Sequence, residues 1–241
     1  MSVVIKGPAE GDLLKTIRLF RDLQPQDLER VREAARRKVV EADEFLFFQE
    51  DPAEKIYVLL EGRIKLAQVT PEGQQVILRY ITAGEAFAVV AVLSGMKYPV
   101  TAQSTGPAKL LYWERSRMHE LMASCPGLAL NALSIMGSRV KEFQDRIREL
   151  STERVERRIA RTLLRLARQA GEKTPEGVLI KLSLTRQDLA ELSGTTLFTV
   201  SRTLSQWEGK GIIETGRERV LIRFPHGLVS IAEDLPPREN A

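Results

Sequence analysis

Cysteine and histidine are both scarce in this sequence, which has one cysteine and two histidines among 241 residues. The single Cys125 cannot form a disulfide within the chain, and an iron–sulfur cluster needs several thiolates. His119 and His226 lie far apart, and there is no nucleophile–histidine–acid set, metal-spaced cluster or phosphate loop of the Walker type. These absences argue against an enzyme and against a protein-bound metal.

Long apolar runs are missing as well. No stretch reaches the roughly eighteen apolar residues of a membrane-spanning helix. The N-terminal MSVVIKGPAEGD lacks the apolar core of a signal peptide, and a lone cysteine suits a reducing compartment. We therefore expect a cytoplasmic protein that does not bind membranes.

Charge is plentiful but nearly balanced, with 36 Lys and Arg against 32 Asp and Glu and a net charge of +4. This mild basicity permits a polyanionic partner without requiring one. Six arginines fall between residues 154 and 168, where they indicate either a solvated helix face or contacts with phosphates.

Short apolar and β-branched runs, separated by turn signals such as Glu50-Asp51-Pro52 and Glu61-Gly62, dominate residues 38–113. Such runs predict short strands in an antiparallel barrel or sandwich. Two helical pieces that meet at Gln24-Pro25 precede them, because proline disfavours helix in the residue before it. The runs are 38–40, 45–48, 56–60, 64–66, 76–80 and 109–112.

A long helix is expected from Pro126 to about Leu150. Its apolar residues follow the alternating steps of three and four that form a coiled-coil seam. Branched residues at a and large residues at d favour two parallel helices, so we expect this face to pair with a second copy. The alternative is a helix packed on its own barrel. The a positions are Leu133, Val140 and Ile147, and the d positions are Met136, Phe143 and Leu150.

A second helix is predicted after this one. Thr152 is placed to cap it, and Ala170-Gly171 to end it. A polar loop over 172–177 and a strand over 178–182 are expected next.

The segment 184–213, LTRQDLAELSGTTLFTVSRTLSQWEGKGII, predicts a helix-turn-helix. Thr185 and Asp188 have the spacing of a capping box, and Gly194 suits a tight turn that needs positive φ. Thr195 or Thr196 would cap the second helix, which ends at Lys210-Gly211. Two short strands around Gly216-Arg217-Glu218 would then form a wing.

The second helix of this motif has two distinct faces. Val200, Thr203, Leu204 and Trp207 share one face by helical spacing. The opposite face suits a DNA major groove, because arginine can bond bidentately to guanine and apolar groups can meet thymine methyls. That face carries Leu197, Phe198, Ser201, Arg202 and Ser205.

From about residue 13 to 230 the chain resembles the Crp/Fnr superfamily of bacterial transcription regulators. The resemblance rests on the strings VLLEGRIKL, AGEAF, RRIARTLLRLA and LTRQDLAELSGTT…TVSR. It implies an α+β fold with an antiparallel, jelly-roll-like β-roll sensor domain over 1–125, a dimerisation helix over 126–150 and a winged helix-turn-helix domain over 151–241. It also implies double-stranded DNA and RNA polymerase as partners of a homodimer.

Residue roles follow from the same resemblance. Arg186, Thr196 and Thr199 would contact phosphates, while Leu197, Phe198, Ser201 and Arg202 would face the bases. Ser205 is also expected to bind DNA. Many members of the superfamily carry glutamate where this chain has Phe198. Glutamate accepts a hydrogen bond from cytosine and phenylalanine cannot, so we expect a different base preference at that position.

The sensor sequence departs from that of the cyclic-AMP binders in the superfamily. Their Gly-Glu pair matches Gly84 and Glu85, but their Arg-Ser pair aligns with Tyr98-Pro99 and their Thr-Ser pair with Phe143-Gln144. Without that arginine an anionic phosphate would be poorly stabilised beside Glu85. We therefore expect no response to cyclic AMP. The effector pocket is expected around Gly84, Glu85, Tyr98, Phe143 and Gln144, if an effector exists.

Haem is the alternative cofactor, because gas-sensing branches of the superfamily bind it; otherwise no cofactor is expected. A haem-dependent regulator of the same architecture therefore stays open, as does one that acts without any ligand. Met96, Met118, Met122 and Met136 would be the methionine ligands beside His119 and His226.

Overall fold

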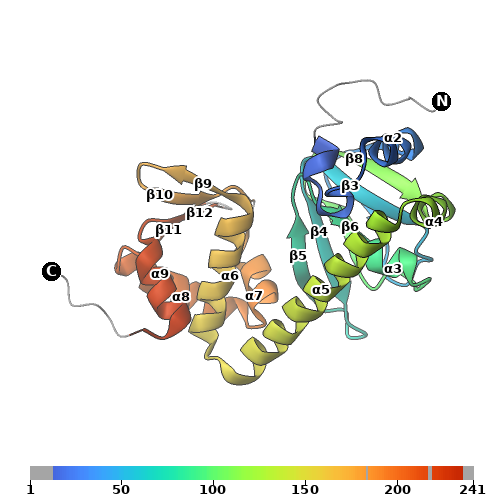
Figure 1. Cartoon of the computed structure of the whole chain (residues 1–241). Coiled ribbons are helices and arrows are strands. Elements are labelled where there is room, and N and C mark those ends of the chain that lie inside the picture. The colour runs from blue at the N-terminus through green and yellow to red at the C-terminus, as the bar shows by residue number, and fades with distance from the viewer. Residues whose placement is uncertain (1–12, 183, 217–218, 236–241) are drawn as a thin grey trace. The chain divides into compact units, whose positions relative to one another are not determined.

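The computed structural model describes residues 13–182, 184–216 and 219–235, and the chain divides into two compact units (Figure 1). The first unit comprises Met1–Gln75 and Arg79–Phe143, and the second Val76–Leu78 and Gln144–Ala241. The division falls inside the long helix α5 (Pro126–Thr152). The expected three domains over 1–125, 126–150 and 151–241 stay a prediction.

Two four-stranded sheets form the body of the first unit, with strand orders β1-β8-β3-β6 and β2-β7-β4-β5. The pairs β1–β8, β3–β8, β3–β6, β2–β7 and β4–β7 are antiparallel, as a β-roll requires. The strands are β1 (Arg36–Val40), β2 (Phe45–Phe47), β3 (Lys55–Glu61), β4 (Ile64–Val69), β5 (Gln75–Ile81), β6 (Ala86–Phe87), β7 (Thr101–Ser104) and β8 (Ala108–Glu114).

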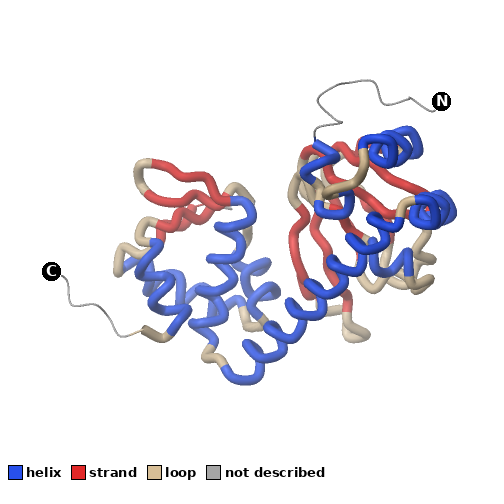
Figure 2. The backbone as a smooth tube through the Cα atoms, viewed as in Figure 1, coloured by secondary structure: helices blue, strands red, loops and turns tan. Residues whose placement is uncertain are grey.

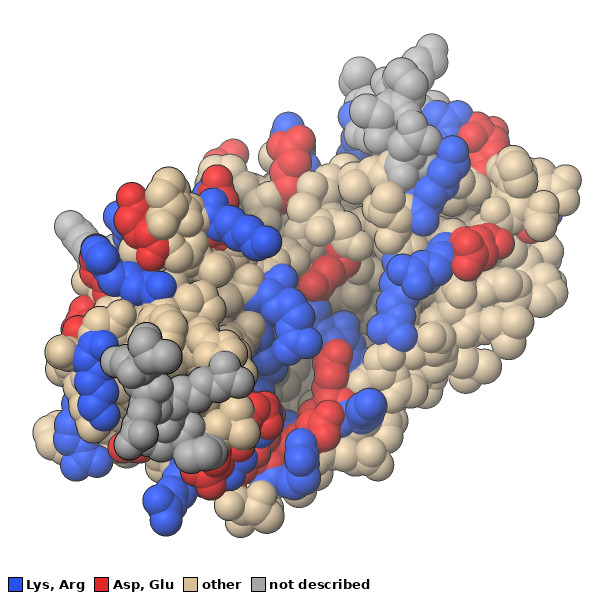
Figure 3. All heavy atoms as spheres, turned by 60° about the vertical axis from the view of Figure 1, so that its left-hand side comes forward, with Lys and Arg blue, Asp and Glu red and all other residues tan. Residues whose placement is uncertain are grey.

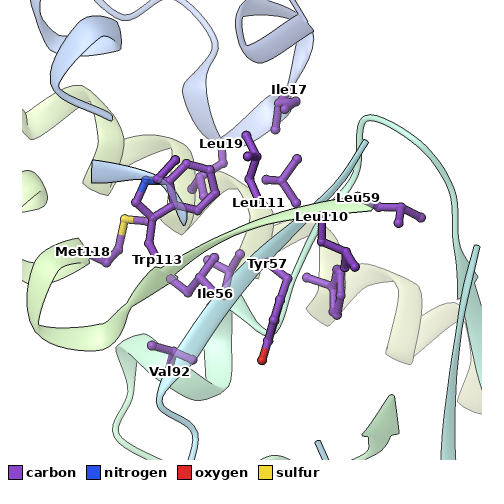
Figure 4. Close-up of a cluster of buried hydrophobic side chains, with 14 of the residues drawn as sticks. Ile17, Leu19, Ile56, Tyr57, Leu59, Val92, Leu110, Leu111, Trp113 and Met118 are labelled. Atoms are coloured by element: carbon purple, nitrogen blue, oxygen red, sulfur yellow. The ribbon is translucent and has the colours of Figure 1, made fainter. Parts of the chain in front are cut away.

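The core of this unit joins the N-terminal helices to the sheets (Figure 4). Trp113 on β8 is fully buried, packs on Phe20 with ring centroids 5.2 Å apart, and donates from Nε1 to the carbonyl oxygen of Val31 at 2.8 Å. Burying an aromatic ring while satisfying its polar atom is favourable. This contact fixes α2 (Pro25–Ala34) and the short 3₁₀ helix η1 (Arg18–Phe20).

Three elements of the first unit, two strands and one short helix, were not predicted. The apolar stretch after Glu85 contains β6 and the short helix α3 (Val89–Leu93), and β7 follows it. A further helix, α4 (Arg115–Ser124), leads into α5. The six expected strands and the break at Pro25 are confirmed.

The second unit combines helices with a four-stranded antiparallel sheet of order β11-β12-β10-β9 (Figure 2). The expected loop over 172–177 is wrong, because β9 and β10 form a hairpin there. The elements are α6 (Val155–Ala170), β9 (Gly171–Thr174), β10 (Gly177–Ile180), α7 (Arg186–Ser193), α8 (Leu197–Gly209), β11 (Ile213–Gly216), β12 (Arg219–Ile222) and α9 (Pro225–Glu233).

The predicted cap at Thr152 is also wrong. Thr152 is the last residue of α5, and its hydroxyl donates to the carbonyl oxygen of Arg148 at 2.8 Å. Helix α6 begins after Arg154, which makes no side-chain cap bond. A threonine that bonds back into the preceding turn cannot also cap the next helix.

No single helix within the described ranges is long and apolar enough to cross a membrane, and α4 with α5 passes such a test only as a pair bent by 116°.

Candidate nucleic-acid interface

The turn between α7 and α8 is built as the sequence predicts. Thr185 Oγ1 accepts from the backbone N–H of Asp188 at 3.0 Å, and Asp188 Oδ2 accepts from that of Thr185 at 2.9 Å. Gly194 ends α7 with φ +64°, and a Cβ there would lie 2.8 Å from Leu150 Cδ2. The turn therefore needs glycine for both conformation and space.

Helix α8 begins directly after Thr196, which caps it by accepting from the backbone N–H of Thr199 at 3.3 Å. Thr195, the other candidate, is therefore not the cap of α8. The predicted inner face is confirmed, because Val200, Thr203, Leu204 and Trp207 are all buried. This packing fixes which face of α8 points outward.

The outward face of α8 carries the expected base-reading residues. Phe198 is 74% exposed and Leu197 48% exposed, while Arg202 and Ser205 are exposed and Ser201 is half-buried. Phe198 lies one helical turn from Arg202. An exposed surface of this kind suits a partner that has both apolar and hydrogen-bonding groups. The base edges of the major groove have that chemistry.

A hairpin of β11 and β12, here called the wing, lies beside α8. Glu208 Oε1 on α8 accepts from both the backbone N–H and the hydroxyl of Thr215, each at 2.7 Å. Arg186 Nη2 donates to Thr215 Oγ1 at 3.5 Å. These contacts join the start of α7, α8 and the wing, and no sequence motif signals Glu208. Part of the wing turn, Arg217 and Glu218, lies outside the described residues.

Four of the six arginines between residues 154 and 168 are used within the second unit. Arg157 and Arg161 pair with Glu153 and with acids at the end of α9, while Arg158 and Arg165 bond to carbonyl oxygens and to Glu149. Because these four side chains have partners within the protein, neither of the two predicted roles, a solvated helix face or contact with phosphates, applies to them. The remaining Arg154 and Arg168 are exposed. Basic and acidic side chains stand next to one another on the face drawn in Figure 3.

The first unit contains a cavity of about 220 Å³ next to Gly84 and Glu85. Glu85 is bonded to Arg79 and to Thr82, the latter at 3.3 Å. Arg79 Nη1 lies 4.0 Å from Glu142, and its buried Nε has no hydrogen-bond partner. No motif in the sequence predicts the charged wall that α5 and β5 supply. The lining residues are Arg18, Arg79, Gly84, Glu85, Ala86, Ile135, Arg139 and Glu142.

The other expected pocket residues do not line this cavity. Tyr98 is buried against Phe47 with ring centroids 3.7 Å apart, and its hydroxyl bonds to the backbone N–H and carbonyl of Lys55. Burial raises the pKa of Tyr98. Phe143 is 60% exposed on α5, and Gln144 begins the second unit. Of the five residues expected around the effector pocket, Gly84 and Glu85 line the cavity.

The heptad residues of α5 form an exposed apolar stripe. Leu133, Val140, Phe143 and Ile147 each expose more than half of their surface, whereas Leu128, Ala132 and Ile135 on the other side of the helix are buried. The alternative, that the seam packs on the chain's own barrel, is therefore wrong for Leu133, Val140 and Phe143, which belong to the first unit. Met136 and Leu150, the other two members, are 37% and 46% exposed.

The candidate haem ligands are dispersed. On α4, His119 is exposed while Met118 is buried, and His226 lies in the second unit. Across the described residues no group of three or more His, Cys, Asp and Glu side chains is arranged to hold a metal ion. Among the residues that the structure describes, no contact favours haem.

Comparison with known protein families gives two matches. Residues 37–125 match the cyclic nucleotide-binding domain, and residues 157–231 match the Crp-like helix-turn-helix domain. These ranges contain the cavity wall at Gly84 and Glu85 and the reading face of α8.

Two curated relatives are similar over most of their length. The global nitrogen regulator of Synechocystis sp. is 28% identical over 185 residues, which span 76% of this chain and 82% of the relative. The nitrogen fixation regulation protein FixK of Azorhizobium caulinodans is 28% identical over 180 residues, which span 74% of this chain and 71% of the relative.

Solved structures share the fold. FixK2 from Bradyrhizobium japonicum matches with a TM-score of 0.72 at 21% identity, over 86% of this chain and 99% of that one. The c-di-GMP responsive global regulator CLP of Xanthomonas campestris matches with a TM-score of 0.71 at 19% identity, over 83% and 99%.

Proposed function

The chain belongs to the Crp/Fnr superfamily and is a DNA-binding transcription regulator rather than an enzyme; from this premise we propose that it works as a homodimer, reads a palindromic site with α8, and does not respond to cyclic AMP. RNA polymerase is its expected protein partner at a promoter. The observation that carries the proposal is the outward face of α8.

Base reading follows from the chemistry of that face. Arg202 supplies a fork of donors that fits the O6 and N7 acceptors of guanine. Phe198 and Leu197 offer apolar surface to thymine methyl groups, and Ser201 adds an adaptable hydroxyl. Thr196, Thr199 and Arg186, at the helix start and beside the wing, are placed to bind the phosphates on either side. We therefore assign base reading to the first group and positioning to the second.

Dimer formation follows from the stripe on α5. Burying a large apolar side chain contributes about 1.5–3 kcal/mol, so six residues from each copy supply a substantial driving force. The 3.5-residue period of the stripe matches a two-stranded coiled coil. A twofold axis along α5 would repeat the reading helix and so favour a palindrome.

Insensitivity to cyclic AMP follows from the cavity. Its volume of about 220 Å³ falls below the ~300 Å³ at which pockets for drug-sized ligands begin. Glu85 is already bonded to Arg79. Tyr98 and Pro99, which align with the arginine and serine of the cyclic-AMP binders, do not line the cavity. A bound nucleotide would bring its negative charge next to Glu85 and Glu142, and two of the three arginines that line the cavity, Arg79 and Arg139, are already paired with these acids.

Selection of bound sequences from a random duplex library tests the proposal. We expect an inverted repeat with a guanine and a thymine in each half-site. A Phe198→Glu variant should change the selected base toward cytosine, because glutamate accepts a hydrogen bond from cytosine N4. Failure of the wild-type protein to enrich any sequence would contradict the proposal.

A further inference from the structure

The carbonyl groups at the end of α7 are bound by arginines from two other helices. Arg158 on α6 donates from Nε to the carbonyl oxygen of Ser193 at 3.1 Å and from Nη2 to that of Gly194 at 2.9 Å. Arg146 on α5 donates from Nη2 to the carbonyl oxygen of Leu192. Carbonyls at a helix C-terminus have no partner within the helix, and cations there also face the negative end of the helix dipole.

A nearly buried carboxylate binds Arg146 together with a third arginine, Arg165. The side chain of Glu149 is 8% exposed, accepts from Arg165 Nη1 at 2.9 Å, and pairs with Arg146 Nη1 at 3.3 Å. Desolvation lowers the pKa of Arg146, and the nearby charge of Arg165 lowers it further, while Glu149 opposes both effects. Glu149 therefore offsets the repulsion within a cluster that is here called the arginine junction (Arg146, Glu149, Arg158 and Arg165).

Close packing completes the junction. Leu150, in the last turns of α5, lies where a side chain on Gly194 would have to go. Arg158 also donates from Nη1 to the carbonyl oxygen of Glu153, in the link between α5 and α6. The end of α5, the start of α6 and the turn after α7 therefore meet at one point.

We propose that Arg158, together with the Arg146 that Glu149 binds, is a positioning residue and that the two fix the start of α8 relative to the end of α5. The inference rests on the proposed function, in which α5 pairs two copies and α8 reads DNA. Only Thr195 and Thr196 separate Gly194 from α8, so the junction sets the direction in which α8 enters the groove. Base contacts need side chains held within about 0.5 Å of their productive position.

The bonds of Arg158 are specific to a guanidinium. Its Nε, Nη1 and Nη2 each bond to a carbonyl oxygen, so its donors are used within the protein rather than offered to phosphate. Lysine keeps the charge but cannot reproduce a planar fork. An Arg158→Lys variant therefore removes the geometry and retains the cation.

The test compares wild type, Arg158→Lys and Glu149→Gln by thermal unfolding, by active fraction from stoichiometric titration, and by Kd for the selected site and for unrelated DNA. We expect the active protein to lose about tenfold or more in affinity for the selected site, with affinity for unrelated DNA unchanged. The matched control is Arg168→Lys, at an exposed position on the same helix, which should behave as wild type.

A role confined to folding predicts another result. Tm and active fraction would fall, but the ratio of specific to unspecific affinity in the active protein would stay at the wild-type value, and that outcome overturns the inference. If wild type itself does not distinguish the selected site, the proposed function fails and the inference fails with it. If Glu149→Gln does not fold, Arg158→Lys alone decides.

Discussion

Phe198 and Trp207 lie on opposite faces of α8, with 74% of the phenylalanine exposed and 2% of the tryptophan. Trp207 therefore anchors α8 in the protein core, while Phe198 is exposed on the face that is proposed to read DNA. Truncating each should separate stability from DNA recognition.

Phe198→Ala should leave the unfolding transition within about 0.5 kcal/mol of wild type, as is usual for exposed positions. Affinity for the selected DNA site should fall about five- to 150-fold, because a mismatched base contact typically costs about 1–3 kcal/mol. Fluorescence anisotropy with labelled duplex measures the affinity. Trp207→Ala is the counterpart and should cost about 3–5 kcal/mol of stability. Equal effects of the two changes on stability would contradict the assignment.

A charge in the α5 stripe should break the dimer. Val140→Asp places a carboxylate in the seam, where burial without a partner is unfavourable. Light scattering should then give the mass of one chain, about 27 kDa. Affinity for a palindrome should fall about a hundredfold or more, because the second half-site is no longer reached through a linked copy.

Lys141→Asp is the control for that change. Residue 141 is the next position along α5, exposed but outside the heptad seam, so this variant should remain dimeric. A dimeric Val140→Asp variant would show that copies associate through another surface.

Cyclic AMP should not stabilise the protein. A ligand present at about a hundred times its Kd raises the free energy of unfolding by about 2.7 kcal/mol, which a thermal melt detects readily. We expect no change in Tm with millimolar cyclic AMP, whereas the selected duplex should raise Tm under the same conditions. A nucleotide-dependent rise in Tm would mean that the Arg79–Glu85 pair opens to admit it.

Cys125 should react slowly in the native protein. It is 4% exposed, and burial raises the pKa of its thiol, so little thiolate forms near neutral pH. The thiolate is the reactive species. Alkylation should therefore proceed much more slowly in buffer than in denaturant, as mass spectrometry can follow. Equal rates would show that this part of the first unit opens readily.

Local patterns predicted much of this fold. The alternation and turn signals located six of the eight strands in the first unit, and the spacing of Val200, Thr203, Leu204 and Trp207 gave both faces of α8. The capping box at Thr185 and the turn at Gly194 depend only on residues close in sequence, so both could be predicted from the sequence.

Elements without such local signals were missed. In the stretch after Glu85, a continuous apolar run conceals the start of α3, where Ala88 adopts φ +63° although it is not glycine. Thr152 has the right chemistry for a cap, but its hydroxyl bonds to Arg148 instead. The Arg79–Glu85 pair and the arginine junction depend on tertiary contacts, which no spacing in the sequence predicts.

The affinity of the dimer for two half-sites at varied separation tests the central claim most directly. At constant salt, binding should be tightest when the half-site centres are one helical turn, about 10–10.5 base pairs, or a multiple of it apart. Inserting about five base pairs, half a turn, should weaken binding about a hundredfold. Equal affinity at every separation, or for a single half-site, would contradict a dimer that reads a palindrome with two copies of α8.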